Sequence, residues 1–545
     1  MKESLPGLVV TGASGFVGRH FLASAAGKYR LFCLARRSRQ EAGIPDYPDM
    51  RWTQVDVAEW AKMRDVLRCI KDHGGADYVL HLAGYYDFHN MENPEYERTN
   101  VRGTRNVLKL ARQLGVKRFI FASSLAACRF PEPGQTLVED SPADATFAYA
   151  RSKRQGEDLV RQEAEWFPSA VVRMAAIFSD WCEYPPLFVL MRTWLSESWD
   201  SRILAGHGES AVPYLHVQDL TRFFLRVIER SDELPRFVTY NASPSTTGSH
   251  RELQDAVTRY FYGEARTPRF FPRWLCVIGL VLRWRLGRFL GHEPFEAPWM
   301  AEYIDKKLLV DAGWTHAALD WTPTARLSIN RRLLLMVDNM KAQSEVWRQR
   351  NEEALRRAPQ RPNLVIVHHL ENLRDQLVDR IVEEIRLPQN AELFPRHQEL
   401  KPDALRWSIM FVYQVLISAT RARDKRLVRQ YARAIALSRY REGFTVEQVQ
   451  GALTRAGEII VKGLSACPEL AHQQQHIYDY VNLSFQLACD GVADAYEVMQ
   501  EQGPELGELL MGSEPPMEAA DLQQMVRQLE DLCEDAAPTF LGPPR

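Results

Sequence analysis

The first part of the chain alternates two spacings of hydrophobic positions. Up to about residue 240, short apolar runs are separated by longer stretches in which apolar residues recur every three or four positions. Short apolar runs predict β-strands, and the amphipathic stretches predict helices. The predicted strands cover residues 8–11, 31–35, 78–83, 118–123 and 170–174. Strands and helices in alternation indicate a parallel, doubly wound sheet, so we predict an α/β domain here.

From about residue 330 the pattern changes to one long amphipathic stretch after another. These stretches predict helices over residues 364–385, 404–420, 426–440, 446–464 and 477–500. Because almost no strand pattern remains, we predict an all-α helical bundle at 364–510. We expect a helical linker at 336–363 before the bundle and a flexible tail at 511–545 after it.

Composition narrows the class of protein. The 545 residues are too many for one ordinary hydrophobic core, which agrees with at least two domains. The 68 basic and 70 acidic residues leave a formal charge of −2, so no overall field draws the chain to nucleic acid. The eight cysteines contain no Cys-x-x-Cys pair, which argues against a structural zinc site or a disulfide framework and favours the cytoplasm. No stretch approaches the roughly 20 apolar residues that span a bilayer.

A turn rich in glycine follows the first predicted strand. The sequence TGASGFVG, residues 11–18, stands between that strand and a predicted helix. A dinucleotide site needs a strand, a tight turn that the pyrophosphate can approach, and a helix N-terminus that points at this anion. Gly12, Gly15 and Gly18 have the spacing for such a turn, although three glycines can also fall near one another by chance.

The end of the second predicted strand bears on the choice of dinucleotide. Arg36 and Arg37 stand where an acidic residue would hold the ribose 2′-hydroxyl of NAD. Guanidinium groups suit a 2′-phosphate better than a hydroxyl, so we favour NADP(H), with NAD(H) as the alternative. Solvent-exposed arginines that follow a strand and bind no cofactor would give the same sequence pattern. Asp56 follows the third strand and is a candidate either for the adenine amine or for an ordinary helix N-cap.

Tyrosine, lysine and serine supply the candidate chemistry. Tyr149 and Lys153 are four residues apart, so on a helix they lie on one face. A nearby ammonium favours the phenolate and would lower the pKa of the tyrosine. Ser123 and Ser124 end a predicted strand, where the active-site crevice of a doubly wound sheet lies. A serine hydroxyl there could bind a substrate oxygen.

Together these features resemble the extended short-chain dehydrogenase/reductases. That family includes nucleotide-sugar epimerases and dehydratases, 3β-hydroxysteroid dehydrogenases and dihydroflavonol-type reductases. The resemblance covers about residues 5–330 and includes YVLHLAG at 78–84, ERTNVRGT at 97–104 and VPYLHVQDL at 212–220. It implies one domain at 1–335, with a Rossmann-type core at about 5–180 and a small substrate-binding lobe at 180–335.

The resemblance also implies roles for single residues. Tyr149 would be the general acid/base, Lys153 would lower its pKa and hold the nicotinamide ribose, and Ser124, chosen over Ser123 by the family register, would polarise the reacting oxygen. Asn100 would support the proton relay. The residues assigned to cofactor binding are Gly12, Ser14, Gly15, Phe16, Val17, Gly18, Arg36, Arg37, Asp56, Val57, Leu82, Ala83 and Lys153.

The implied activity is an NAD(P)-dependent oxidoreductase that acts on a secondary alcohol or ketone of a small, apolar substrate. Family dehydratases carry an Asp-Glu pair after the serine position, where this chain has Leu125 and Ala126, so dehydration is disfavoured. Two alternatives stay open. One is a sugar-nucleotide epimerase with tightly bound NAD, and the other is a regulatory protein that senses redox state or nucleotide.

Two further segments suggest partners. Residues 265–292 carry six arginines, several aromatic residues and no acid, which suits either peripheral membrane contact through 266–290 or a helix packed on the core. The sequence LSRYREGFTVEQVQGALTRAGEIIVKGL at 437–464 resembles the helical N-terminal sensor modules of stressosome co-antagonist proteins. That resemblance implies a ligand-sensing or dimerising module, and we expect a homodimer.

Overall fold

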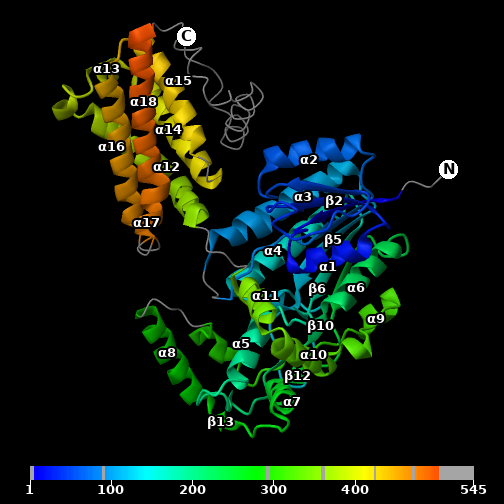
Figure 1. Cartoon of the computed structure of the whole chain (residues 1–545). Helices are drawn as coiled ribbons and strands as arrows, with labels where there is room; N and C mark the ends of the chain where they lie inside the picture. Colours follow the sequence, from blue (N-terminus) through cyan, green and yellow to red (C-terminus); the bar gives the residue numbers. More distant parts are fainter. Residues whose placement is uncertain are drawn as a thin grey trace. The chain divides into compact units, whose positions relative to one another are not determined.

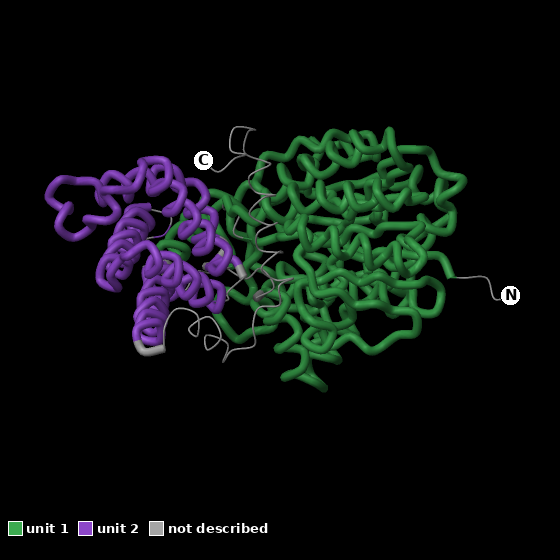
Figure 2. The backbone as a smooth tube through the Cα atoms, turned by 90° about the horizontal axis from the view of Figure 1, so that it is seen from above, with its two compact units in different colours: residues 1–359 green, residues 360–545 purple. Residues whose placement is uncertain are grey.

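The computed structural model describes residues 5–88, 92–289, 295–356, 362–422, 425–467, 470 and 473–502. The chain divides into two compact units, residues 1–359 and 360–545 (Figure 2). The tail predicted at 511–545 lies outside the described residues.

A seven-stranded parallel sheet forms the centre of unit 1 (Figure 1). Its strands are β1 (Gly7–Thr11), β2 (Arg30–Ala35), β3 (Met50–Gln54), β4 (Tyr78–His81), β5 (Arg118–Ser124), β6 (Ser169–Met174) and β11 (Phe237–Ala242). The strand order is β11-β6-β5-β4-β1-β2-β3, and every pairing within this sheet is parallel. The order changes direction between β1 and β4, which is where such sheets open a ligand crevice at the carboxyl ends of the strands.

Helices cover both faces of this sheet. They are α1 (Phe16–Ala25) and α6 (Val217–Glu229) on one face, and α2 (Trp60–Asp72), α3 (Gly103–Leu114) and α4 (Ala148–Glu163) on the other. Phe21 of α1 meets Phe224 of α6 edge to face, with ring centroids 6.2 Å apart. Because both faces exclude water, the strands are apolar almost throughout. The predicted Rossmann-type α/β fold is confirmed.

A smaller lobe of unit 1 follows β6. Its helices are α5 (Pro185–Trp194), α7 (His250–Tyr262), α8 (Arg273–Phe289), α9 (Gly313–Leu319), α10 (Ile329–Ala342) and α11 (Ser344–Arg356). Short strand pairs join β7 (Ala176–Phe178) to β10 (Tyr214–His216), β8 (Ile203–Ala205) to β13 (Arg269–Phe271), and β9 (Ala211–Val212) to β12 (Gly248–Ser249). Trp347 of α11 is buried with its ring 5.1 Å from that of Phe188 in α5. The segment expected as a linker was 336–363. Its residues 336–356 are packed into this lobe, because their apolar face joins the core of the lobe.

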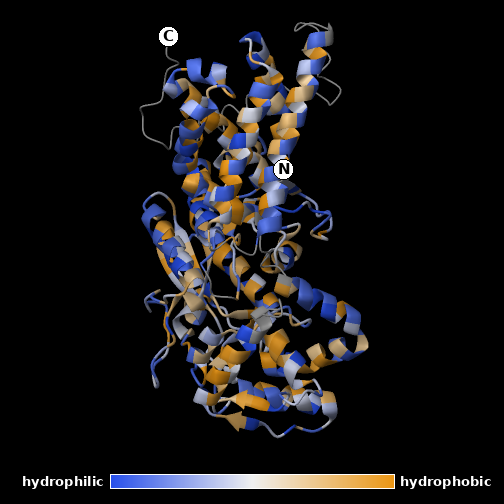
Figure 3. Ribbon diagram, turned by 90° about the vertical axis from the view of Figure 1, so that its left-hand side faces the viewer, coloured by the Kyte–Doolittle hydropathy of each residue, from blue (hydrophilic) through white to orange (hydrophobic). Residues whose placement is uncertain are grey.

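Unit 2 is a helical bundle, as predicted. Its helices are α12 (Pro362–Arg386), α13 (Pro395–Glu399), α14 (Pro402–Ala422), α15 (Arg426–Arg441), α16 (Val446–Ser465), α17 (Gln474–Ile477) and α18 (Leu483–Gln502). Hydrophobic and hydrophilic positions alternate along these helices (Figure 3), and one buried cluster contains side chains from α12 to α18. Thr445 and Gln448 form a capping box at the start of α16. An interior of this kind lets unit 2 form its own core.

Candidate active site

The glycine turn lies at the carboxyl end of β1, where the strand order changes direction. Gly12 has a φ of 66°, and a Cβ on it would lie 2.7 Å from the Ala83 nitrogen. A Cβ on Gly18 would lie 2.7 Å from the Ala13 carbonyl oxygen. Neither position can hold a side chain without moving the backbone. Gly15 is the N-cap of α1, and no side chain caps the helix, so its first amides can face an anion.

The remaining residues predicted to contact the dinucleotide lie at the same edge of the sheet. Ser14, Phe16 and Val17 belong to the turn and to the start of α1, Asp56 and Val57 follow β3, and Leu82 and Ala83 follow β4. The Ala83 amide donates to Thr11 Oγ1 at 3.1 Å, which ties the segment after β4 to the end of β1. The fold thus brings these positions together as the carboxyl ends of neighbouring strands.

Arg36 and Arg37 both lie at this edge. Arg37 Nη2 donates to the Ser14 carbonyl oxygen at 2.6 Å, which places its guanidinium next to the glycine turn. Arg36 Nη1 is 3.5 Å from Glu95 Oε2, and this buried nitrogen makes no hydrogen bond in the described part of the chain. Because a guanidinium N–H is a strong donor, this nitrogen leaves Arg36 able to bind an anionic oxygen.

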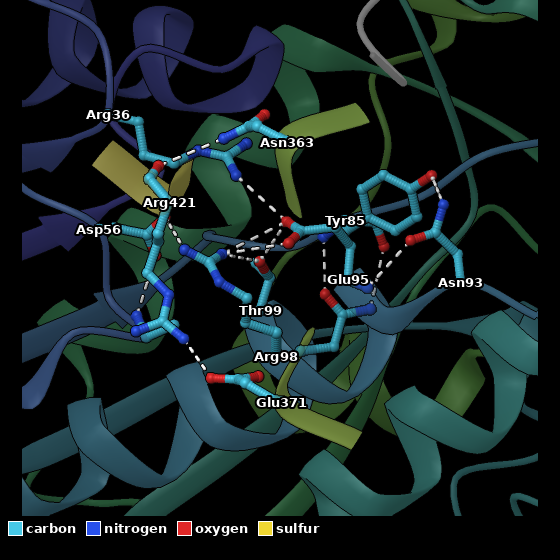
Figure 4. A network of polar contacts seen from close by, with 12 residues as sticks. Arg36, Asp56, Tyr85, Asn93, Glu95, Arg98, Thr99, Asn363, Glu371 and Arg421 are labelled. Atoms are coloured by element: carbon cyan, nitrogen blue, oxygen red, sulfur yellow. Dashed lines mark hydrogen bonds and ion pairs between the residues drawn. The ribbon is translucent and has the colours of Figure 1, made fainter. Parts of the chain in front are cut away.

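A buried network of charges lies beside these arginines (Figure 4). Arg98 Nη2 donates to Asp56 Oδ2 at 2.7 Å, and Arg98 Nη1 lies 3.2 Å from Glu95 Oε1. The Ala58 amide donates to the other Asp56 oxygen at 3.0 Å. Burial acts to raise the pKa of Asp56, but Arg98 and Arg36 hold it below its usual value. Both oxygens of Asp56 therefore have partners within the protein. The N-cap of α2 is Glu59, so Asp56 does not cap that helix, and the Ala58 amide instead closes a turn onto Asp56 before the helix begins. Contact of Asp56 with adenine stays a prediction.

The candidate catalytic side chains come from β5 and α4. Ser124 ends β5, Tyr149 lies in the first turn of α4, and Lys153 lies one turn further along. Lys153 Nζ donates to the Ala122 carbonyl oxygen at 2.8 Å and lies 5.8 Å from the centre of the Tyr149 ring. Ser123 points away from this group, because its hydroxyl donates to Glu157 Oε1 at 2.5 Å in the interior. Of the two serines, Ser124 is thus the one beside Tyr149.

The pKa of Tyr149 differs from the sequence expectation. The ammonium of Lys153 was expected to lower it, but burial raises the pKa of Tyr149 to about 12, and only a hydrogen bond with Ser124 acts in the opposite direction. Burial also lowers the pKa of Lys153 to about 8, which Glu157 partly offsets. Desolvation outweighs the lysine charge here, because both groups lose water when they are buried. In this structure Tyr149 is a protonated phenol at neutral pH.

Asn100 lies in a π-helical turn, η1 (Tyr96–Arg102), that leads into α3. Its side chain accepts from the Tyr85 amide at 2.6 Å and donates to the Tyr85 carbonyl oxygen at 2.9 Å. It also donates to Ser152 Oγ in α4 at 2.8 Å. These three bonds use both N–H groups and one lone pair of the amide, so Asn100 fixes the segment after β4 against the helix that carries Tyr149. Its support of a proton relay stays a prediction.

A buried histidine beneath the site was missed by the sequence reasoning. His81 Nδ1 lies 2.7 Å from Thr11 Oγ1, and its Nε2 lies 3.0 Å from Thr104 Oγ1. Burial, together with the charge of Lys153, lowers the pKa of His81 to about 3. At neutral pH the His81 ring is therefore uncharged, and it links β1, β4 and α3. A lone polar residue inside the apolar run of β4 was the only available signal.

Aromatic side chains surround Tyr149, and the sequence analysis did not predict that they cluster there. The Tyr86 ring centroid lies 4.3 Å from that of Tyr149, and Phe88 lies 4.4 Å from Tyr86. Phe88 in turn lies 5.3 Å from Phe295 and 6.4 Å from Tyr184. The YYDF sequence after β4 was a partial signal, but the other two rings come from distant segments. The wall next to the phenol is consequently aromatic and suits an apolar substrate.

A strained loop after β7 faces the same region. Cys182 and Glu183 have φ values of 71° and 52°, which only glycine adopts without cost. The buried Glu183 carboxylate forms an ion pair with Arg19 of α1. Asn351 of α11 accepts from the Glu183 amide at 2.8 Å and donates to the Trp181 carbonyl oxygen at 2.8 Å. Through these bonds α11 holds the loop against the helix that begins at the glycine turn.

Metal ligation and membrane spanning find no support in the described ranges. These residues contain no group of three or more His, Cys, Asp or Glu side chains placed to hold a metal ion. None of the helices described is both long enough and apolar enough to cross a membrane.

Two family models match the chain. The model of the NAD dependent epimerase/dehydratase family matches residues 8–243. The model of the RsbT co-antagonist protein rsbRD N-terminal domain matches residues 371–504. The sheet and the glycine turn thus define a dinucleotide-binding α/β domain followed by a helical module. More particularly, the N-terminal part of the chain belongs to the NAD dependent epimerase/dehydratase family, and the C-terminal part carries an rsbRD N-terminal domain.

Individual relatives match only parts of the chain. A putative dihydroflavonol 4-reductase of Synechocystis sp. is 29% identical over 28% of this chain and 46% of its own length. A ceramide reductase of Caulobacter vibrioides is 35% identical over 31% and 46%. The N-acetyl-alpha-D-glucosaminyl-diphospho-ditrans,octacis-undecaprenol 4-epimerase of Escherichia coli O157:H7 is 30% identical over 32% and 49%. The chain therefore spans about half the length of these curated relatives.

A solved structure, MoeE5 in complex with UDP-glucose and NAD, is 18% identical with a TM-score of 0.46, and the match covers 62% of this chain and 100% of that one.

Proposed function

We propose that unit 1 is an NAD(P)-dependent oxidoreductase that interconverts a secondary alcohol and a ketone by hydride transfer. The observation that carries this proposal is the placement of three side chains at the carboxyl edge of the sheet. Ser124 ends β5, Tyr149 lies in the first turn of α4, and the Lys153 ammonium lies 5.8 Å from the centre of the Tyr149 ring. The glycine turn lies at the same edge. A protein that only bound a nucleotide would have no use for a phenol coupled to a serine hydroxyl.

The side chains divide the chemistry among them. The nicotinamide of the bound dinucleotide would supply or accept the hydride. In ketone reduction, the Ser124 hydroxyl would donate a hydrogen bond to the carbonyl oxygen, and Tyr149 would give its proton to that oxygen. Because the pKa of Tyr149 is about 12, the phenol is protonated at neutral pH and suited to act as the acid. Lys153, with a pKa of about 8, would be mostly cationic at neutral pH and would stabilise the phenolate that remains.

NADP(H) is our preferred cofactor. Two guanidinium groups offer donors where the ribose of the dinucleotide would lie. Arg37 lies beside the Ser14 carbonyl, and Arg36 Nη1 makes no hydrogen bond to the described residues, although it lies 3.5 Å from the Glu95 carboxylate. Glu95 and Asp56 reduce the local positive charge, so the preference over NAD(H) should be smaller than two unpaired arginines would give.

An apolar substrate is favoured by the aromatic wall of Tyr86, Phe88, Tyr184 and Phe295 around Tyr149. Two of the relatives, the ceramide reductase and the undecaprenol-linked 4-epimerase, are named for lipid substrates. The second candidate activity, epimerisation through a keto intermediate, is favoured by that 4-epimerase and would use the same side chains. An epimerase would keep its dinucleotide through purification, whereas a reductase would release it each cycle.

Unit 2 is proposed as a ligand-sensing or dimerising module, because its match is to the rsbRD N-terminal domain. A homodimer of the full chain would be visible in light scattering after size-exclusion chromatography. The seven described cysteines are all free thiols, which supports placement of the protein in the cytoplasm.

Replacement of Tyr149 by Phe tests the proposal. Reduction of long-chain and polycyclic ketones would be followed by the loss of NADPH fluorescence. Tyr149→Phe should lower turnover by about 100-fold or more, since a general acid contributes about 10²–10⁴. The NADPH dissociation constant should stay within about threefold, because the change removes only one hydroxyl.

Tyr78→Phe is the matched control, because Tyr78 begins β4 at the opposite end of the strand from the site. Its turnover should equal that of the unaltered protein. Turnover that survives Tyr149→Phe would show that the phenol is not the proton donor.

A further inference from the structure

The helix α8 (Arg273–Phe289) presents an apolar face that the described residues of unit 1 leave exposed. Trp274, Ile278 and Leu282 follow one another at intervals of four, so they lie along one side of the helix. They are 64%, 48% and 62% exposed. Phe270, in β13 just before the helix, is 44% exposed. We call these four residues the α8 patch.

The arrangement of the α8 patch differs from the scattered apolar residues found on any protein surface. Elsewhere in unit 1, amphipathic helices such as α6 turn their apolar faces into the core. In α8 the large side chains face water together, and Figure 1 shows the helix at the margin of unit 1 beside β13. A row of exposed aromatic and aliphatic side chains on one helix face marks a surface that a partner covers.

The charge around the α8 patch identifies the partner. Residues 265–289 contain six arginines and no acidic residue, in a chain whose formal charge is only −2. Arg273 and Arg285 are exposed, and Arg283 lies 3.9 Å from Asp200 and 3.8 Å from Glu296. Basic side chains that flank an apolar helix face complement a negatively charged surface with an apolar interior.

We propose that α8 docks unit 1 on an anionic lipid surface, with the α8 patch at the boundary between headgroups and acyl chains. A second copy of this chain fits less well, because a two-fold interface through this face would bring its arginines against their own counterparts. The docking is peripheral, as no described helix could cross a membrane.

A chain of contacts links α8 to the proposed active site, and it begins at Arg283, which lies 3.8 Å from Glu296. Phe295, the first described residue after the α8 segment, contacts Phe88, and Phe88 leads through Tyr86 to the Tyr149 ring. A lipid-derived ketone or alcohol that leaves the bilayer beside α8 would meet apolar rings up to the phenol. This substrate route rests on the proposed function, whereas the docking itself does not.

Flotation of the full chain with vesicles tests the docking. Phosphatidylcholine vesicles with phosphatidylglycerol should carry the protein upward at low salt, and phosphatidylcholine alone should not. The triple change Trp274→Ser, Ile278→Ser and Leu282→Ser should abolish flotation. Arg273→Glu with Arg285→Glu should weaken it by more than tenfold, since each basic residue near such a surface is worth about fivefold.

Trp407→Ser is the matched control, because Trp407 is a similarly exposed tryptophan in unit 2. It should float like the unaltered protein, and so should Tyr149→Phe. Absence of flotation with anionic vesicles, or flotation that survives the triple change, would overturn the docking. A triple variant that changes oligomeric state without lipid would assign the α8 patch to a second copy and overturn it as well. Turnover of a detergent-dispersed ketone, measured in parallel, tests the proposed function separately.

Discussion

Asn351→Ala should loosen the strained loop after β7 and weaken cofactor binding from a distance. The Asn351 side chain makes hydrogen bonds of 2.8 Å to the Glu183 amide and to the Trp181 and Trp347 carbonyl oxygens. Asn351→Ala removes these bonds and leaves the Glu183 amide and the Trp181 carbonyl only their 3.1 Å hydrogen bond to each other. The loss is about 0.5–1.5 kcal/mol for each hydrogen bond removed. The left-handed backbone at Cys182 and Glu183 costs about 1–3 kcal/mol each, so the loop has a less strained alternative once its anchor is gone.

The consequence should reach the glycine turn. Glu183 pairs with Arg19 in α1, so a loop that leaves this conformation withdraws its carboxylate from the helix that would face the pyrophosphate. A loss of about 1.4 kcal/mol in the bound state raises the NADPH dissociation constant about tenfold, and we expect at least that change. Fluorescence titration with NADPH measures it, and thermal unfolding measures global stability.

Asn339→Ala is the control, because Asn339 donates to the Asp180 carbonyl of the same loop at 2.9 Å but holds neither left-handed residue. It should leave the dissociation constant within about twofold. An unchanged dissociation constant in Asn351→Ala, with only the melting temperature lowered, would refute the link between α11 and the cofactor site.

Three further predictions concern the glycine turn, the ribose and the pH profile. Gly18→Ala should abolish NADPH binding in a titration, because the new Cβ would lie 2.7 Å from the Ala13 carbonyl oxygen. Arg36→Ala should lower the ratio of kcat/KM with NADPH to kcat/KM with NADH by about 10–100-fold, which corresponds to the loss of one charge-assisted hydrogen bond. Arg39→Ala is the control and should leave this ratio unchanged, because Arg39 forms a surface ion pair with Asp46. The rate of ketone reduction should fall as pH rises through about 8, because Lys153 then loses the charge that stabilises the phenolate. Lys153→Arg should remove this fall in rate near pH 8. A flat pH profile in the unaltered protein would contradict the role given to Lys153.

Local pattern was sufficient for the elements of the fold. Parallel strands buried on both faces must be apolar runs, so β1, β2, β4, β5 and β6 could be predicted to within a residue or two. The five long amphipathic stretches of unit 2 correspond to α12, α14, α15, α16 and α18, whereas the short helices α13 and α17 were not predicted. The turn at Gly12 and Gly18 could be predicted as well, because glycine is required by local backbone geometry. The capping box of Thr445 and Gln448 is local in the same sense.

The environments of the side chains in the site could not be predicted from local sequence pattern. The spacing of Tyr149 and Lys153 gave their common helix face, but the pKa of Tyr149 depends on how much water the rings of Tyr86 and its neighbours exclude. The role of Asp56 was ambiguous because Arg98, its partner, is 42 residues away. Asn351 and Glu183 are 168 residues apart, and nothing in either local sequence pairs them.

The sequence by itself thus determined the strands, the helices, the phosphate-sized turn and the order of the candidate catalytic groups, because these follow from periodicity and from the limits on single residues. Only the tertiary structure decided how strongly burial shifts the pKa of Tyr149, which partners hold the arginines, and which helix face stays in water. Those outcomes depend on desolvation and on contacts between distant segments, and both arise only when the layers pack.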